Sequence, residues 1–412
     1  MVKKMNSKTY LGNLSTLLMC VCVVTCVLTN FGYYSIHTIS LCIFFMYEFY
    51  KTKHNKLLIN KKTSLVIVMS IVISLLSISQ RNYSDIFKFI KWFILSFAGY
   101  VFIKRYDSEN QKKVCNIVLI IIFLACIEGL VQYFSNKISL VDYLVPWGDN
   151  LRQGTVSIFL QHIVWGHVII VGFVLSSCIT NNKLRLLYKT ILLINLYLCQ
   201  SRSAWLTFFV YLLYLYFPKI RNILFKKMNK TKVLVSFVTF LLLLILLVLN
   251  MNSVSKVFDT IIDHLGMLLK GESNYRTNTI KSLLDYRISN PNLLYLLFGS
   301  GYSSSKIALE NSGLFLSGNR YIVDNQIISI AFEFGIIAFA YVISMFIKSF
   351  KKQNNQSNID KLINLLFICN FCMSLVYESF GYEVTSFIMF FVFGAKIALN
   401  EKKKEEKDVQ IE

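Results

Sequence analysis

Proline and acidic residues are scarce in this sequence. Only 3 prolines occur in 412 residues, and 22 acidic residues are set against 43 basic ones. So few prolines leave long helices uninterrupted. Hydrophobic residues make up 55% of the chain, the mean hydropathy is +0.55, and the apolar residues come in long blocks. Because a helix needs about 20 apolar residues to cross a bilayer, the composition predicts an all-α polytopic membrane protein.

Motifs for nucleotides and metals are missing too. The sequence has no Asp-x-Asp pair of the kind that holds a metal-bound nucleotide sugar and no G-x-x-x-x-G-K phosphate loop. All 10 cysteines lie in apolar runs, which predicts small buried hydrophobic side chains and not a disulfide framework or a zinc site. We therefore expect no metal and no cofactor.

Lysine-rich connections alternate along the chain with lysine-poor ones, which predicts about twelve spans with both termini in the cytoplasm. The net charge of +21 then faces anionic lipid and not nucleic acid. A first span that is not cleaved is expected to follow the basic N-terminus. The expected parts are spans 1–9 in residues 1–250, a large external loop at 251–324, spans 10–12 in residues 325–400, and a charged cytoplasmic tail at 401–412. The expected spans are 11–29, 32–50, 64–79, 86–103, 114–134, 157–179, 187–200, 203–217, 233–250, 325–347, 362–379 and 384–400.

Arginine is concentrated on the expected outer side, whereas lysine dominates the inner side. The orientation rule does not distinguish the two residues, but the planar guanidinium binds phosphate oxygens bidentately and the lysine ammonium does not. The outer side is therefore expected to recognise a phosphate group. The outer arginines are Arg81, Arg152, Arg202, Arg276, Arg287 and Arg320.

The long external loop is expected to be structured. Apolar spacing predicts an amphipathic helix over 254–268 on the outer membrane surface. A second helical stretch, "RTNTIKSLLDYRIS", is expected to end at "ISNPN", since a residue before proline avoids the helical region. The glycine-serine turn "LLFGSGYSSS" follows it, where backbone can approach a ligand.

Several segments occur in an order that resembles a known superfamily. These are "IEGLVQYF", "LRQGT", "SRSAWLTFF", the stretch from Arg276 to "NPNLLYLLFGSGY", and "VDNQIISIAFEFGIIAF". Over roughly 115–400 the chain resembles the bacterial O-antigen polymerase and O-antigen ligase superfamily, most closely the Wzy-type repeat-unit polymerases. The resemblance implies a GT-C-like helical fold in the bacterial inner membrane. Ligases of the superfamily usually carry a histidine where this chain has Asp324, which favours a polymerase.

The resemblance implies a glycosyltransferase that polymerises oligosaccharide repeat units carried on undecaprenyl pyrophosphate. Preorganised cations would stabilise the leaving pyrophosphate, and a base would accept the proton of the attacking hydroxyl. Arg202 and Arg276 are the candidate catalytic cations, and Asp324 is the candidate base. A flippase and a chain-length regulator of the same pathway are expected partners beside the lipid bilayer. The candidate substrate-binding residues are Arg152, Arg287, Arg320, Asn325, Tyr302 and Glu378.

Structural interpretations stay open beside these roles. The segment around Arg202 can be a wet external turn, and Asp324 can cap a helix. Tyrosines such as Tyr302 are also typical of an aromatic belt. Glu128 and Glu333 lie within spans, where a carboxylate is either functional or hydrogen-bonded. His162 and His167 are expected to pack or to form hydrogen bonds rather than bind metal.

Three other functions remain. A ligase of the same superfamily would join finished glycan to another acceptor. A flippase for lipid-linked oligosaccharides fits twelve spans, but the sequence shows no internal repeat and no pair of broken helices. A membrane scaffold does not explain the outer arginines.

Overall fold

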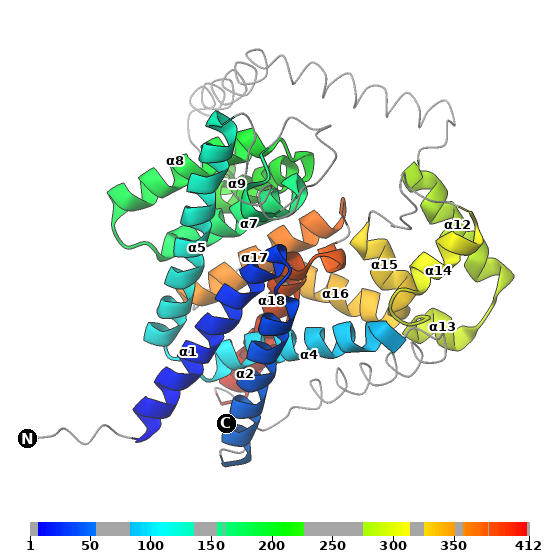
Figure 1. Cartoon of the computed structure of the whole chain (residues 1–412), viewed down its shortest axis with the longest axis horizontal. Helices are drawn as coiled ribbons and strands as arrows, with labels where there is room; N and C mark the ends of the chain where they lie inside the picture. Colours follow the sequence, from blue (N-terminus) through cyan, green and yellow to red (C-terminus); the bar gives the residue numbers. More distant parts are fainter. Residues whose placement is uncertain are drawn as a thin grey trace, which may run out of the picture.

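The computed structural model describes residues 7–54, 83–135, 155–159, 161–225, 275–313, 325–350, 357–377 and 379–409. Within these ranges every regular element is a helix, which confirms the predicted all-α class. Figure 1 shows α5, α7, α8 and α9 together on the left and α12, α13 and α14 on the right. The α-helices are α1 (Ser7–Leu28), α2 (Tyr34–His54), α4 (Tyr83–Lys104), α5 (Ser108–Phe134), α7 (His162–Leu175), α8 (Asn182–Cys199), α9 (Arg202–Phe225), α12 (Tyr275–Ser289), α13 (Leu293–Phe298), α14 (Ser304–Asn311), α15 (Gln326–Glu333), α16 (Gly335–Phe350), α17 (Asn358–Ser374) and α18 (Glu383–Val409).

Three described helical segments are long and apolar enough to cross a membrane: Asn13–Phe31, Ser108–Phe134 and Glu383–Lys402. The segments His162–Cys178 and Gly335–Phe350 are apolar but shorter. The other expected spans also fall on described helices, except two that lie outside the described residues. The structure thus shows an apolar helical protein, while the count of twelve spans and the GT-C-like architecture stay predictions. The two undescribed spans are those expected at 64–79 and 233–250.

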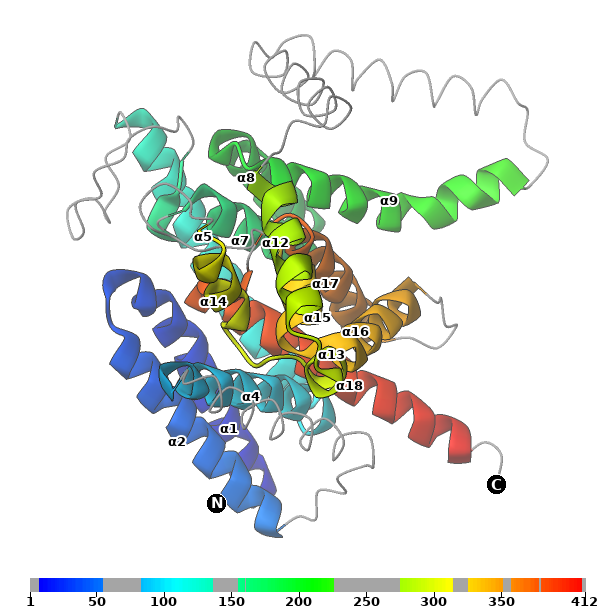
Figure 2. The same ribbon diagram turned by 90° about the vertical axis from the view of Figure 1, so that its right-hand side faces the viewer.

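Helices α4 and α18 pack closely, and small residues bring the two backbones together. A Cβ added to Gly99 of α4 would lie 2.8 Å from Phe391 C and 2.9 Å from Ala395 N. A Cβ on Gly394 of α18 would lie 2.5 Å from Ser96 C. Small residues allow such close helix packing where the hydrophobic effect does not drive association. In Figure 2 this pair lies beside the hairpin of α1 and α2.

Ion pairs join helices in this part of the molecule. Lys91 of α4 pairs with Glu383 at the start of α18. Near the other end of α4, Arg105 Nη1 lies 2.9 Å from Oε2 of Glu48, a fully buried residue of α2. Charged side chains within a helical membrane protein are stabilised by such partners. These residues therefore hold the helix ends in register.

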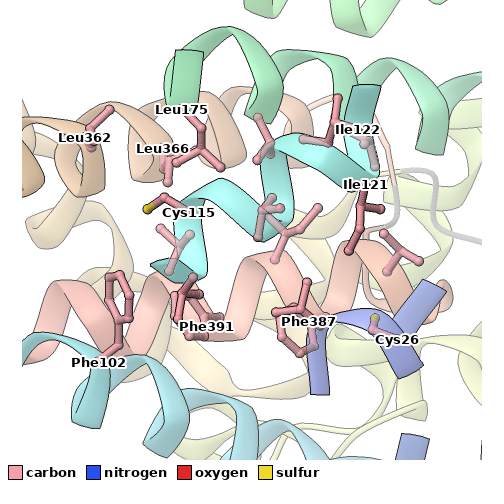
Figure 3. Close-up of a pocket in the computed structure, with 18 of the residues that line it drawn as sticks. Cys26, Phe102, Cys115, Ile121, Ile122, Leu175, Leu362, Leu366, Phe387 and Phe391 are labelled. Carbon is pink, nitrogen blue, oxygen red and sulfur yellow. The ribbon is translucent and has the colours of Figure 1, made fainter. Parts of the chain in front are cut away.

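An apolar pocket of about 120 Å³ lies between α1, α5, α7, α17 and α18. Its lining is hydrocarbon apart from the sulfur atoms of Cys26 and Cys115, as the sticks of Figure 3 show. The pocket therefore offers no group that would bind a sugar or a phosphate. Most of the native cysteines are buried in this core, as expected, but Cys42 is exposed and Cys178 is half-buried.

The tenth expected span, 325–347, is not one helix but two. Helix α15 ends at Glu333, and α16 begins at Gly335, whose φ of +80° is strained for any residue but glycine. The loop after α13 covers the break, where Gly301 N donates to Glu333 O at 3.0 Å. The structure differs here from the prediction because this loop supplies the partners that let the helix end inside the span.

Helices α12, α14 and α15 share a small hydrophobic core of their own. It contains Leu283, Ala308, Leu309 and Phe332. The predicted helix "RTNTIKSLLDYRIS" is confirmed as α12, which ends at Ser289, two residues before Pro291. The amphipathic helix expected at 254–268 lies outside the described residues.

Candidate functional site

The turn between α8 and α9 is built by the residues on either side of Arg202. Gln200 takes a left-handed conformation, with φ +50°, and caps the end of α8. Ser201 precedes α9, and its Oγ accepts a hydrogen bond from Ala204 N at 3.4 Å, as an N-cap residue does. The hydroxyls of Ser201 and Ser203 lie 3.0 Å apart. Both serines therefore shape the turn.

Helix α7 packs directly against this turn. A Cβ on Gly166 would lie 2.6 Å from Ala204 Cβ and 2.9 Å from Ser201 Cβ, so the glycine lets α9 begin directly on α7. The chain that follows Arg152 is fixed at the same place, because Thr155 N donates to Leu198 O of α8 at 2.9 Å. The structure thus brings the segment after Arg152 next to the α8–α9 turn, although Arg152 itself lies outside the described residues.

Arg202 is exposed at the first position of α9. Among the residues that the structure describes, no carboxylate or carbonyl pairs with its guanidinium. The helix dipole disfavours a cation at this end by an energy on the order of 0.3–1 kcal/mol. Helix stability therefore does not explain the arginine. An anion at this position could accept hydrogen bonds from the guanidinium and from the free N–H groups of the first turn of α9.

His167, which follows Gly166 in α7, forms a buried polar pair with Asn370 of α17. His167 Nε2 is 2.5 Å from Asn370 Oδ1 of α17, and both side chains are buried. Ser374 Oγ donates to the Asn370 carbonyl at 2.9 Å. This hydrogen bond agrees with the interpretation of His167 as a hydrogen-bonded residue. Sequence reasoning missed Asn370, which is 203 residues away.

Arg287 and Tyr302, two of the candidate substrate-binding residues, lie on the loop that the sequence predicts to be external. Arg287 Nη2 donates to the Phe332 carbonyl in the last turn of α15 at 2.6 Å, and its guanidinium lies 4.4 Å above the Phe332 ring. Burial lowers the pKa of this guanidinium from its ordinary value. Tyr302 is only 2% exposed and packs edge-on against Trp92, with ring centroids 4.4 Å apart. In this conformation both side chains face protein.

Glu333 and Asn325 mark the two ends of α15. Asn325 is the N-cap residue, and its side chain accepts from Ile328 N at 3.2 Å. Asn325 therefore supplies the cap that was one interpretation of Asp324. Glu333, the last residue of α15, is 3% exposed and accepts a hydrogen bond from Ser305 Oγ of α14. This contact ties the helix end to the loop that covers it.

The predicted residues do not all meet in one place. Arg276 is the second residue of α12, on the right of Figure 1, whereas Arg202 begins α9 on the left. The structure therefore joins the segment after Arg152 to the turn of Arg202, but it does not bring the start of α12 to that turn. Outside the described residues lie Arg152, Arg320, Asp324 and Glu378, and the side chain of Arg276 is not described.

The comparison with protein families covers both parts of this site. Residues 187–343 match the O-antigen ligase family. The matched segment begins in α8 and ends in α16, so it contains Arg202, all of α12 and the broken helix. The resemblance to the O-antigen ligase and polymerase superfamily is thereby confirmed. Together with the apolar helices, the O-antigen ligase family match identifies a membrane protein. No curated protein matches the chain.

Proposed function

We propose that this protein polymerises lipid-linked oligosaccharide repeat units at the outer face of the bacterial cytoplasmic membrane. The observation that carries the proposal is Arg202. It is an exposed cation at a helix N-terminus, without a carboxylate partner among the described residues, in a turn that α7 fixes and that the family match includes. Such a group suits an anion that arrives from outside the protein, and a pyrophosphate is an anion of that kind.

In the proposed reaction, a sugar hydroxyl of one lipid-linked unit attacks the anomeric carbon of the growing glycan. The bond from that carbon to the undecaprenyl pyrophosphate breaks, and the pyrophosphate leaves with the bonding electron pair. Arg202, with Arg152, stabilises the charge that develops on the leaving group. Arg276, which lies on α12 away from that turn, is a separate candidate cation for the pyrophosphate, and its own variant tests it. Asp324 accepts the proton of the hydroxyl. Neither a nucleotide nor a metal takes part in this scheme.

A ligase of the same superfamily is the second candidate, because the matched family carries that name. A ligase would transfer finished glycan to a different acceptor through the same leaving group. The identity of the acceptor therefore decides between the two functions, and the cation at Arg202 serves both.

The test compares surface glycan length in a deletion strain that is complemented with matched amounts of each variant. We expect Arg202→Ala and Arg276→Ala to slow polymerisation by about 10²–10³-fold, as the loss of one stabilising donor does in other enzymes. Arg202→Lys should recover part of the activity, because it keeps the charge but not the fork. Arg185→Ala is the control, since Arg185 is a half-buried arginine in the first turn of α8, at the end of that helix away from the turn.

Single repeat units on the normal anchor, without long chains, support polymerisation. Long chains that stay on the lipid carrier identify a ligase. Lipid-linked units that accumulate on the inner face identify a flippase and refute the proposal. Normal chain length in the Arg202→Ala strain would remove Arg202 from the mechanism.

A further inference from the structure

An exposed apolar surface lies within the large external loop that the sequence predicts at 251–324. We call residues 286–298 the elbow: they comprise the end of α12, a short connection and α13. Four large apolar side chains of the elbow are open to the surroundings. They are Ile288, Leu293, Leu294 and Leu296, which are 75%, 69%, 59% and 45% exposed. Contiguous exposed apolar residues of this size indicate an interaction surface.

The charge of the elbow and the first backbone N–H groups of α13 have partners within the protein, although the polar residues of the connection, Ser289, Asn290 and Asn292, are exposed. Arg287 is the one charged residue in the sequence 286–298, and its guanidinium turns inward to the Phe332 carbonyl. The side chain of Asn292 accepts from Leu294 N at 2.9 Å and from Tyr295 N at 3.4 Å, which caps α13. Backbone groups that have internal partners are a requirement for a segment surrounded by hydrocarbon.

The exposed surface of the elbow continues onto a membrane helix. The end of α13 packs on the start of α16, where a Cβ on Gly335 would lie 2.5 Å from Gly299 N. The next two residues of α16, Ile336 and Ile337, are 47% and 38% exposed. Helix α16 is one of the shorter apolar helices of the described residues, so we expect lipid to cover its open face. Elbow and α16 therefore present one apolar surface.

Depth supports the same conclusion. The elbow packs against the break between α15 and α16, and α15 has 8 residues. At 1.5 Å per residue, the break lies about 12 Å along the chain from Asn325. With Asn325 at the outer mouth of the tenth span, as the sequence predicts, this places the break inside a hydrocarbon core of about 30 Å. A segment that contacts the break lies at a similar depth.

We propose that the elbow is a re-entrant segment whose exposed side chains contact the acyl chains of the bilayer. Lipid is the occupant that the structure favours, because the large exposed side chains of the elbow and of the adjoining start of α16 are apolar and the one charged side chain of the elbow turns inward. The elbow thus anchors α12, and with it Arg276, at the membrane surface. That last consequence rests on the proposed function, whereas the contact with lipid does not.

The test places a thiol on the elbow and asks whether water or lipid surrounds it. Leu294→Cys is compared with Lys281→Cys, an exposed position on α12 that lies about two turns before Ile288. The wild type gives the background labelling of the native cysteines. The full-length protein is reconstituted in vesicles of phosphatidylethanolamine and phosphatidylglycerol. A membrane-impermeant maleimide should react with Leu294→Cys at least about tenfold more slowly than with Lys281→Cys, because hydrocarbon disfavours the reactive thiolate.

A second measurement identifies what covers the surface. A small fluorophore is attached to either cysteine in detergent, and the protein is then reconstituted with a phospholipid that carries a nitroxide on its acyl chain. We expect quenching at position 294 and none at position 281. Fast maleimide labelling at 294 would show that the elbow lies in water, and slow labelling without quenching would show that protein covers it. Either result overturns the proposal. Ile288→Cys repeats the test if Leu294→Cys does not fold, and none of these readouts depends on glycan synthesis.

Discussion

Gly335 offers the sharpest test of the broken helix. A methyl group at this position meets two penalties. The φ of +80° costs an L-residue about 1–2 kcal/mol. The added Cβ would also lie 2.5 Å from Gly299 N, and accommodating such overpacking typically costs about 1–3 kcal/mol. Gly335→Ala should therefore destabilise the folded protein by about 2–5 kcal/mol.

Two other glycines separate these penalties. Gly313 has a φ of +68°, and a Cβ added there would have nothing within 4 Å, so Gly313→Ala measures the backbone strain alone. Gly381 has open space around it and no left-handed φ, so Gly381→Ala should have almost no effect. We therefore expect Gly335→Ala to lose the most stability, Gly313→Ala to lose less, and Gly381→Ala to lose the least.

Thermal unfolding in detergent can be followed with a dye that fluoresces on reaction with thiols, because most native cysteines are buried until the protein unfolds. A loss of about 2–5 kcal/mol should lower the midpoint of Gly335→Ala by about 2–6 °C, because the unfolding entropy is about 2.1 cal/mol/K per residue and the chain has 412 residues. Equal midpoints for Gly335→Ala and Gly313→Ala would mean that no backbone lies against position 335. The docking of the α13 loop on the helix break would then be wrong.

Three further substitutions test other contacts by the same unfolding assay. Gly99→Val should abolish the folded state, since even a Cβ would lie 2.8 Å from Phe391 C; a stable variant would contradict the close pairing of α4 and α18. Ser201→Ala should cost about 1 kcal/mol through the lost N-cap, and an unchanged midpoint would mean that the hydroxyl does not cap α9. Ser305→Ala removes a buried hydroxyl donor to Glu333 and should cost about 1–3 kcal/mol, more than the same change at the exposed Ser177.

The helices were predictable because their apolar blocks are long. The end of α12 was predictable as well, since Pro291 restricts the residue before it. The break at Gly335 was not predicted, although a glycine after "FEF" is a visible signal. Whether a glycine ends a helix depends on a partner for the freed carbonyls, and that partner is a loop about 30 residues earlier in the chain.

The polar contacts of the candidate site were harder to predict for the same reason. A hydrogen bond between His167 and Asn370 joins residues 203 positions apart, and neither local spacing nor composition relates them. The cap of α15 fell on Asn325 and not on Asp324, a difference of one residue that only the geometry of the helix start decides. What the residues do locally was easier to predict than which residues meet.

The same distinction explains the motif "SRS" at 201–203. One interpretation makes this segment a turn, and the other makes it an anion site. In the structure each interpretation fits different residues of the motif. Ser201 and Ser203 form the turn, while the guanidinium of Arg202 has no partner among the described residues and remains available to an anion. A serine that caps a helix and an arginine that the helix dipole disfavours would not be placed side by side by stability alone. Ser201 should therefore affect mainly the folding of the protein, and Arg202 mainly the length of the glycan.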